Sequence, residues 1–245
     1  RRKALCDYNS MIDTNKIIFL TGAPGSKWSA VSWVLSESDN IPVDKTDRTP
    51  DRLMVHKDAY NGIRHTGVYF GPGMELGHDF HNINKLTKQE ILDEIQKGWP
   101  EWDDSKYHIV RCHQFINNFD WLVDVFPKSK FCVVTRLPNQ CVNGWMSVGG
   151  IDIPYPKYKD YYIDNSNAER LIKQEAMLAQ KAFWDHQMDT YVAGSGHFKR
   201  KFGLEITDEE SDLAKYIRSL EGYMYLNDNP YAKLKHDVII GYLNF

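Results

Sequence analysis

Residues 16–29 of the chain, KIIFLTGAPGSKWS, contain the pattern that decides the fold. The apolar run from Lys16 to Thr21 is typical of a short buried strand. Residues 22–25 then predict a tight loop, and the segment from Ser26 to Leu35 has the composition of a helix. A strand, a tight loop and a helix in this order are typical of the edge at which α/β sheets bind their ligands.

Two more strands are predicted farther along the chain. Residues 107–112 (YHIVRC) and 130–135 (KFCVVT) are apolar and β-branched, as expected for strands buried on both faces of a parallel sheet. Between them, residues 118–126 indicate a short helix, which Pro127 ends.

Capping-box patterns predict three further helices, over residues 87–97, 166–190 and 207–220. Strands that alternate with helices predict an α/β fold. We therefore expect one three-layer domain over residues 1–245, with a central, mostly parallel sheet and helices on both faces. Residues 43–104 are rich in Gly, His, Asn and Asp and predict an insertion or lid within that domain.

The composition excludes several classes of protein. The 30 Lys and Arg against 33 Asp and Glu give a net charge of −3, which does not favour nucleic acid as the main partner. No apolar stretch reaches about 18 residues, so no membrane span is expected. The four cysteines lack a CxxC spacing and predict free thiols in a reducing, cytoplasmic environment. The chain begins with Arg1, so we expect that a natural N-terminal segment has been removed.

The loop after the first strand has the chemistry of an anion site. Unpaired N–H groups at a helix start favour an anion, Lys27 adds a full charge, and the hydroxyls of Ser26 and Ser29 can donate to phosphate oxygens. The loop is not a Walker A motif, because Ser26 separates Gly25 from Lys27 and Trp28 occupies the place of the metal-binding hydroxyl. The alternative is an ordinary strand–helix turn with a surface lysine.

The ends of the second and third strands also present polar side chains. Arg111 and His113 follow the second strand, and a histidine can accept a proton near neutral pH. Arg136 ends the third strand, where a guanidinium suits bidentate contact with a phosphate. The alternatives are a structural hydrogen bond for His113 and a salt bridge for Arg136.

These three strand ends together resemble the sulfotransferases that use PAPS, 3′-phosphoadenosine 5′-phosphosulfate. Pro24-Gly25-Ser26-Lys27-Trp28-Ser29 is similar to their motif PKSGTTW with Gly and Lys exchanged. Arg111-Cys112-His113 is similar to their KTH, and residues 136–144 (RLPNQCVNG) are similar to their RNPxDxxxS. Residues 201–210 (KFGLEITDEE) resemble a helix start that is common late in these enzymes.

The resemblance implies a P-loop-like fold and a role for each motif. Residues 24–29 bind the 5′-phosphosulfate of PAPS, and Arg136, Asn143 and Gly144 bind the 3′-phosphate. His113 is the catalytic base, assisted by Lys27 and Arg111. The product is adenosine 3′,5′-bisphosphate, the acceptor is a small molecule or a glycan, and no metal is obligatory. Gly144 stands where the family has serine, so Asn143 or Ser147 has to supply that contact.

Two other functions stay open from the sequence. A nucleotide-dependent kinase with a degenerate P-loop requires Mg²⁺ and an acidic ligand at a strand end. A non-catalytic nucleotide-binding protein on the same fold requires only the phosphate sites. The histidines of the 43–104 segment lack the spacing of a metal site, so no metal is expected. Its aromatic residues either line an acceptor pocket or anchor the insertion to the sheet; they are Tyr69, Phe70, Trp99 and Trp102.

Overall fold

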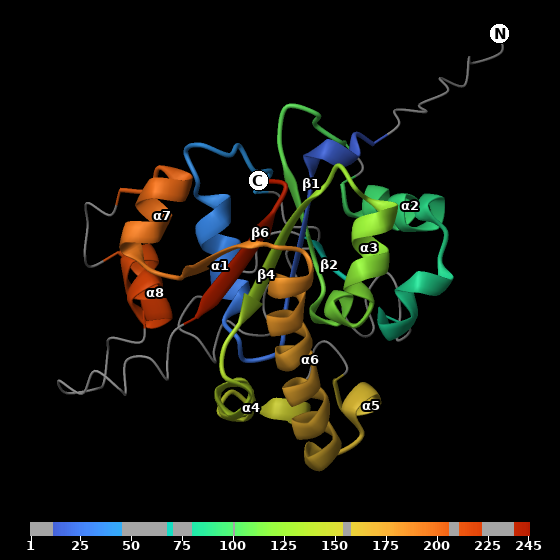
Figure 1. The fold of residues 1–245 in the computed structure, drawn as a ribbon, viewed down its shortest axis with the longest axis vertical. Helices are drawn as coiled ribbons and strands as arrows, with labels where there is room; N and C mark the ends of the chain where they lie inside the picture. The colour runs from blue at the N-terminus through green and yellow to red at the C-terminus, as the bar shows by residue number, and fades with distance from the viewer. Residues whose placement is uncertain are drawn as a thin grey trace, which may run out of the picture.

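A computed structural model describes residues 12–45, 68–70, 80–99, 101–153, 158–205, 211–221 and 238–245. Its centre is a six-stranded sheet in the order β2-β3-β1-β4-β6-β5 (Figure 1). The strands are β1 (Ile17–Gly22), β2 (Val68–Tyr69), β3 (His108–Arg111), β4 (Lys130–Thr135), β5 (Asp189–Val192) and β6 (Ile239–Leu243).

The centre of this sheet is parallel, as the sequence predicts. Strands β2, β3, β1 and β4 run in one direction, whereas β6 pairs antiparallel with β4 and β5 pairs antiparallel with β6. The three predicted strands lie within one residue of β1, β3 and β4 at either end. The sequence analysis did not predict β2, β5 or β6.

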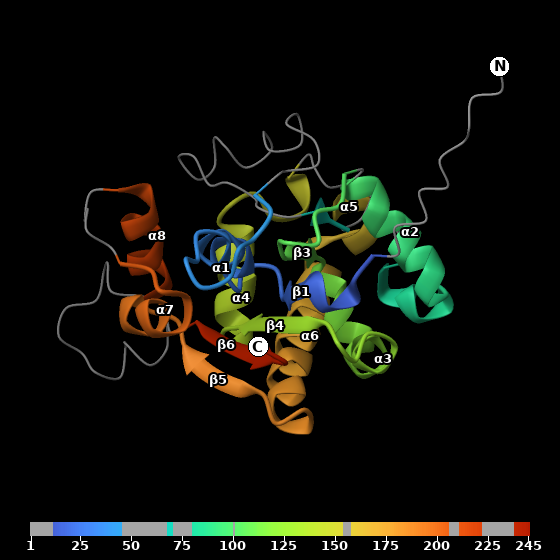
Figure 2. The same ribbon diagram turned by 90° about the horizontal axis from the view of Figure 1, so that it is seen from above.

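Helices cover the sheet on both faces. The α-helices are α1 (Trp28–Ser36), α2 (Lys88–Gly98), α3 (Phe119–Val125), α4 (Pro138–Met146), α5 (Tyr158–Tyr162), α6 (Asn165–Asp185), α7 (Ser195–Phe202) and α8 (Asp212–Glu221). Short 3₁₀ helices are η1 (Thr14–Lys16), η3 (Phe80–Lys85), η4 (His113–Asn118) and η5 (Gly150–Asp152). Figure 2 shows α1, α7 and α8 on one side of the sheet and α2, α3 and α6 on the other.

Alternating residues of the central strands fill two separate cores, because successive side chains of a strand point to opposite faces. Ile17 and Phe19 of β1 pack in the core formed with α2, α3 and α6. Ile18 and Leu20 pack in the core formed with α1, α7 and α8. A strand that is buried on both faces in this way is apolar throughout, which is why the sequence of β1 predicts it.

Both predicted ends of the helix over 166–190 are wrong. The helix expected over 166–190 is α6, which begins after Asp164, whose carboxylate accepts from the N–H of Asn167 at 2.8 Å; Ser166 is not its cap. It ends at Asp185, and the chain turns through Gln187, whose φ of 49° is left-handed, into β5. The capping box at Thr87 is confirmed, since its hydroxyl accepts from the N–H of Glu90 at 3.3 Å.

The segment from 43 to 104 contributes to the same sheet and core wherever the structure describes it. Strand β2 pairs with β3, and α2 buries Ile91 and Ile95 in the core. Residues 46–67, 71–79 and 100 of this segment lie outside the described residues, as do residues 206–210, where the third capping box is predicted. No helix in the described part of the chain is long and apolar enough to cross a membrane.

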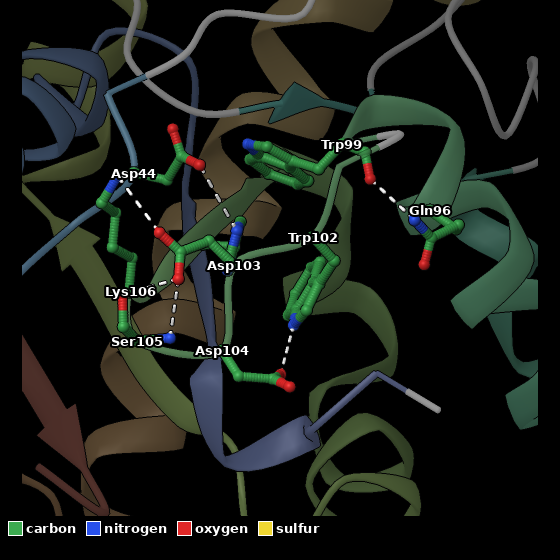
Figure 3. Close-up of polar contacts among 9 residues, drawn as sticks. Asp44, Gln96, Trp99, Trp102, Asp103, Asp104, Ser105 and Lys106 are labelled. Carbon is green, nitrogen blue, oxygen red and sulfur yellow. Dashed lines mark hydrogen bonds and ion pairs between the residues drawn. The ribbon is translucent and has the colours of Figure 1, made fainter. Parts of the chain in front are cut away.

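Aromatic residues of the 43–104 segment pack against the amino end of β3. His108 is fully buried there, with the ring of Trp102 stacked on it at 3.6 Å and Trp99 against its edge at 5.0 Å. Figure 3 shows the two tryptophans with their partners: Gln96 donates to the carbonyl of Trp99 and the indole of Trp102 donates to Asp104. Trp99 and Trp102 therefore anchor the segment to the sheet.

The described cysteines are free thiols in the interior. Cys112, Cys132 and Cys141 are all buried, and burial raises the pKa of each thiol. They are therefore uncharged and poorly nucleophilic in the folded state. Cys6 lies outside the described residues.

Candidate active site

The three polar strand ends meet at one edge of the sheet. Because β1 lies between β3 and β4 and all three are parallel, their carboxyl ends are neighbours. The hydroxyl of Thr21 at the end of β1 donates to the carbonyl of His113 at 3.0 Å, and Arg136 after β4 reaches the carbonyl of Gly25 at 3.4 Å. Figure 1 shows α4 and α5 at this end of the sheet. The structure thus brings the predicted motifs together.

The loop after β1 is a tight turn with two left-handed residues. The N–H of Ser26 donates to the carbonyl of Ala23 at 2.9 Å, and both Gly25 (φ 77°) and Lys27 (φ 73°) have positive φ. The left-handed conformation costs a lysine about 1–2 kcal/mol relative to glycine. Lys27 is also the N-cap of α1, which is why the helix starts at Trp28 and not at Ser26. Backbone strain of this kind is typical of functional loops.

Gly25 is required by the close approach of α4. A Cβ atom at this position would lie 1.9 Å from the carbonyl oxygen of Cys141. The close contact between α4 and the loop also explains why Gly144 stands where the resembled family has serine. A Cβ at Gly144 already meets the carbonyl oxygen of Gly25 at 3.2 Å and Nη1 of Arg136 at 3.7 Å.

We expect Gly25→Ala to destabilise the protein by about 3 kcal/mol or more, because the new methyl group collides with backbone and the left-handed φ is strained. Urea unfolding followed by circular dichroism measures the loss. The matched control is Gly196→Ala in α7, whose Cβ would meet only Nη1 of Arg200 at 3.5 Å. Equal free energies of unfolding for the two variants would show that α4 does not approach Gly25 closely enough to exclude a Cβ atom.

Two cations lie close together beside this loop. Burial lowers the pKa of Lys27, and the nearby positive charge of Arg136 lowers it further. Burial also lowers the pKa of Arg136. Among the described residues, no carboxylate forms an ion pair with Arg136. Two partly buried cations that repel each other favour a bound anion. The anion would reduce their mutual repulsion and would offset the free energy that each cation loses on leaving water.

The serine and tryptophan of the loop have different surroundings. The hydroxyl of Ser26 is fully buried and has no hydrogen-bond partner among the described residues, so its donor is unused in this structure. Trp28 packs in the core, with its ring 5.7 Å from that of Tyr69 and 5.9 Å from the guanidinium of Arg111. Pro24 is buried, and Ser29 is half-buried in the first turn of α1.

Two residues predicted from the third motif lie on α4. Asn143 is exposed and Gly144 faces the loop. The hydroxyl of Ser147 donates to the carbonyl of Gly144 at 2.9 Å, so this serine is already bonded within its own helix. Asn143 is therefore the one of the two side chains that is not bonded to the carbonyl of Gly144.

His113 is buried at the start of η4 and is bonded to a carboxylate that the sequence analysis missed. Its Nδ1 lies 3.0 Å from Oε2 of Glu175 on α6, and its Nε2 has no hydrogen-bond partner among the described residues. Three tyrosines of α5 surround the ring at centroid distances of 6.1–6.3 Å; they are Tyr158, Tyr161 and Tyr162. Burial and the charge of Glu175 raise the pKa of these three phenols, which therefore stay protonated.

A signal for Glu175 does exist in the sequence. The buried stripe of α6 contains Ala168, Ile172, Ala176 and Ala179, and Glu175 lies within that stripe as its acidic member. An acidic residue at an apolar position of a helix indicates a buried partner. What the sequence could not indicate was that this partner is His113.

Nothing in the described side chains indicates a metal centre: no group of three or more His, Cys, Asp or Glu among them is arranged to hold an ion. The histidine-rich stretch around residue 78 lies outside the described side chains.

In comparisons with known proteins, no family model, no curated protein and no solved structure matches the chain.

Proposed function

We propose that this protein is a sulfotransferase, which moves a sulfuryl group from PAPS to a hydroxyl or amine group of a small-molecule or glycan acceptor. The observation that carries the proposal is the meeting of three strand ends. They bring a buried histidine with an unpartnered Nε2 beside a loop that contains Lys27 and is contacted by Arg136. This is the pairing of a proton acceptor with an anion site that group transfer to a hydroxyl requires.

Each side chain has a role in an in-line displacement. His113 accepts the proton of the acceptor as the acceptor atom bonds to sulfur. The bond between sulfur and the phosphate oxygen breaks, and adenosine 3′,5′-bisphosphate leaves with the electron pair. Lys27, the Ser26 hydroxyl and the N–H groups at the start of α1 stabilise the charge on that phosphate. Arg111 holds the sulfuryl oxygens, and Arg136, together with Asn143 and Gly144 of α4, holds the 3′-phosphate.

The alternative of a kinase is less well supported. Strands β1, β3 and β4 end in Gly22, Arg111 and Thr135, and none of these is an acidic ligand for Mg²⁺. The buried Glu175 is engaged by His113. A sulfuryl group carries less negative charge than a phosphoryl group. Two cationic side chains can therefore stabilise its transfer, and the transfer does not require a metal ion.

One observation favours a non-catalytic nucleotide-binding protein as the second candidate. His113 has no exposed surface. An acceptor can reach its Nε2 only when side chains around it, including the tyrosines of α5, move aside. In a pure binding module no such movement would be needed.

A transfer assay separates the three functions. Sulfur-labelled PAPS without metal, and ATP labelled in its γ-phosphate with Mg²⁺, are offered with a panel of phenols, alcohols, amines and sugars. We expect labelled sulfate ester or sulfamate from PAPS and no labelled product from ATP. Transfer from ATP alone would identify a kinase, and nucleotide binding without any transfer would favour the binding module.

The buried free thiols also bear on location. Cys112, Cys132 and Cys141 are unpaired, which fits a reducing compartment. We therefore include a cytoplasmic location in the proposal.

A further inference from the structure

The carboxylate of Glu175 is buried where a hydrophobic side chain would be expected. The residue is 1% exposed and lies in the apolar stripe of α6, between Ile172 and Ala179. Its Oε2 contacts His113, and its Oε1 has no hydrogen-bond partner among the described residues. Burying a carboxylate costs several kcal/mol, and a buried carboxylate–imidazole pair is often no more stable than well-packed apolar residues in the place of both partners. Glu175 is therefore not explained by stability, and the mechanism above gives it no role.

The two partners are held in place from separate strand ends. On one side, Thr21 of β1 donates to the carbonyl of His113. On the other, the hydroxyl of Thr135 at the end of β4 lies 3.2 Å from the carbonyl of Ala176, the residue after Glu175, and shares its one proton between this carbonyl and that of Arg136 at the same distance. Backbone tethers on both partners fix the distance between the imidazole and the carboxylate before any substrate binds.

The imidazole ring is also restrained from its face. Tyr162 lies over His113 with a centroid distance of 6.2 Å and an interplanar angle of 24°. Tyr162 is in turn fixed to α6, because the side-chain amide of Asn167 donates to its carbonyl at 2.9 Å. The ring therefore keeps Nδ1 toward Glu175, and Nε2 remains on the opposite side.

We propose that Glu175 is a positioning residue that makes His113 a base at Nε2. Because the carboxylate can only accept, Nδ1 of the neutral imidazole carries the hydrogen and Nε2 carries the lone pair. When Nε2 takes the proton of the acceptor, the ring becomes an imidazolium whose charge Glu175 stabilises across the existing hydrogen bond. No proton moves to the carboxylate. The catalytic part of this proposal rests on the proposed function, whereas the fixed tautomer does not.

The test compares Glu175→Gln with the intact protein by nitrogen NMR of labelled histidine. The signals of His113 are assigned by their absence from His113→Gln. In the parent protein we expect a single tautomer with hydrogen on Nδ1. In Glu175→Gln we expect a mixture, because the new amide can donate to Nδ1 as well as accept from it. A parent tautomer with hydrogen on Nε2, or an unchanged tautomer in the variant, would overturn the proposal.

Steady-state kinetics provide the second measurement. Glu175→Gln should lower kcat by about 10²–10⁴-fold, with KM for the donor changed by less than about threefold. Glu175→Asp, which keeps the charge, should recover part of the rate. The control is Glu169→Gln, an exposed residue of α6 paired with Lys173, which should alter neither tautomer nor kcat. A shifted tautomer in a protein that transfers no sulfuryl group would refute the proposed function and leave the positioning intact. An undiminished kcat in folded Glu175→Gln would refute the positioning role.

Discussion

Replacing His113 with alanine is expected to lower kcat by about 10²–10⁴-fold, the usual contribution of a positioned proton acceptor. The reason is that Nε2 is the ring nitrogen left without a hydrogen-bond partner among the described residues, whereas Nδ1 is bonded to Glu175. Binding of adenosine 3′,5′-bisphosphate should survive, because the proposed function assigns its phosphates to the loop at 24–29 and to Arg136, not to His113. Steady-state kinetics with a working acceptor, together with calorimetric titration of the bisphosphate, measure both effects.

A second variant keeps this experiment interpretable. His113→Ala leaves the carboxylate of Glu175 buried without a partner, which destabilises the fold by about 1–3 kcal/mol or more. His113→Gln retains a donor to Glu175 but no base, so it should lose the same rate with less loss of stability. The control is His186→Ala, since His186 pairs with Asp120 beside α3 at 2.7 Å and takes no part in the site. Full turnover in a folded His113→Gln would mean that the base is elsewhere.

The elements that could be predicted from the sequence are those determined by residues close to one another in the chain. Strands β1 and β4 are buried on both faces and flanked by Gly or Pro, so their burial pattern is continuous in the sequence. The capping box of α2 consists of Thr87 and Glu90, three residues apart. The loop after β1 combines a strand end with a helix start, and the structure confirms this order, with β1 ending at Gly22 and α1 beginning at Trp28.

The parts that sequence reasoning missed depend on contacts between distant residues. Strand β5 is exposed and four residues long, and it forms because β6, about fifty residues later, pairs with it. Glu175 is 62 residues from His113, and no local pattern indicates that α6 packs against η4. The close fit of Gly25 and Gly144 likewise follows from the packing of α4 on the loop.

Arg136→Ala is expected to weaken binding of adenosine 3′,5′-bisphosphate by about 2–4 kcal/mol, which is about 30–1,000-fold in Kd. Arg136 is half-buried and has no carboxylate partner among the described residues, so its guanidinium is available to a phosphate. The structure adds a complication, because Nη1 of Arg136 also donates to the carbonyl of Gly25 at 3.4 Å. Loss of this contact would loosen the loop to which the proposed function assigns the 5′-phosphate.

AMP distinguishes these two effects, because it has the 5′-phosphate and lacks the 3′-phosphate. The central claim is that the loop at 24–29 and Arg136 form separate phosphate sites for one nucleotide. Its most direct test is calorimetric titration of adenosine 3′,5′-bisphosphate and AMP, without metal, into the parent protein and Arg136→Ala. The account predicts that the parent binds the bisphosphate about 30–1,000-fold more tightly than AMP and that the variant loses this preference while its affinity for AMP hardly changes. Equal affinities in the parent protein, or an equal loss for both nucleotides in the variant, would contradict it.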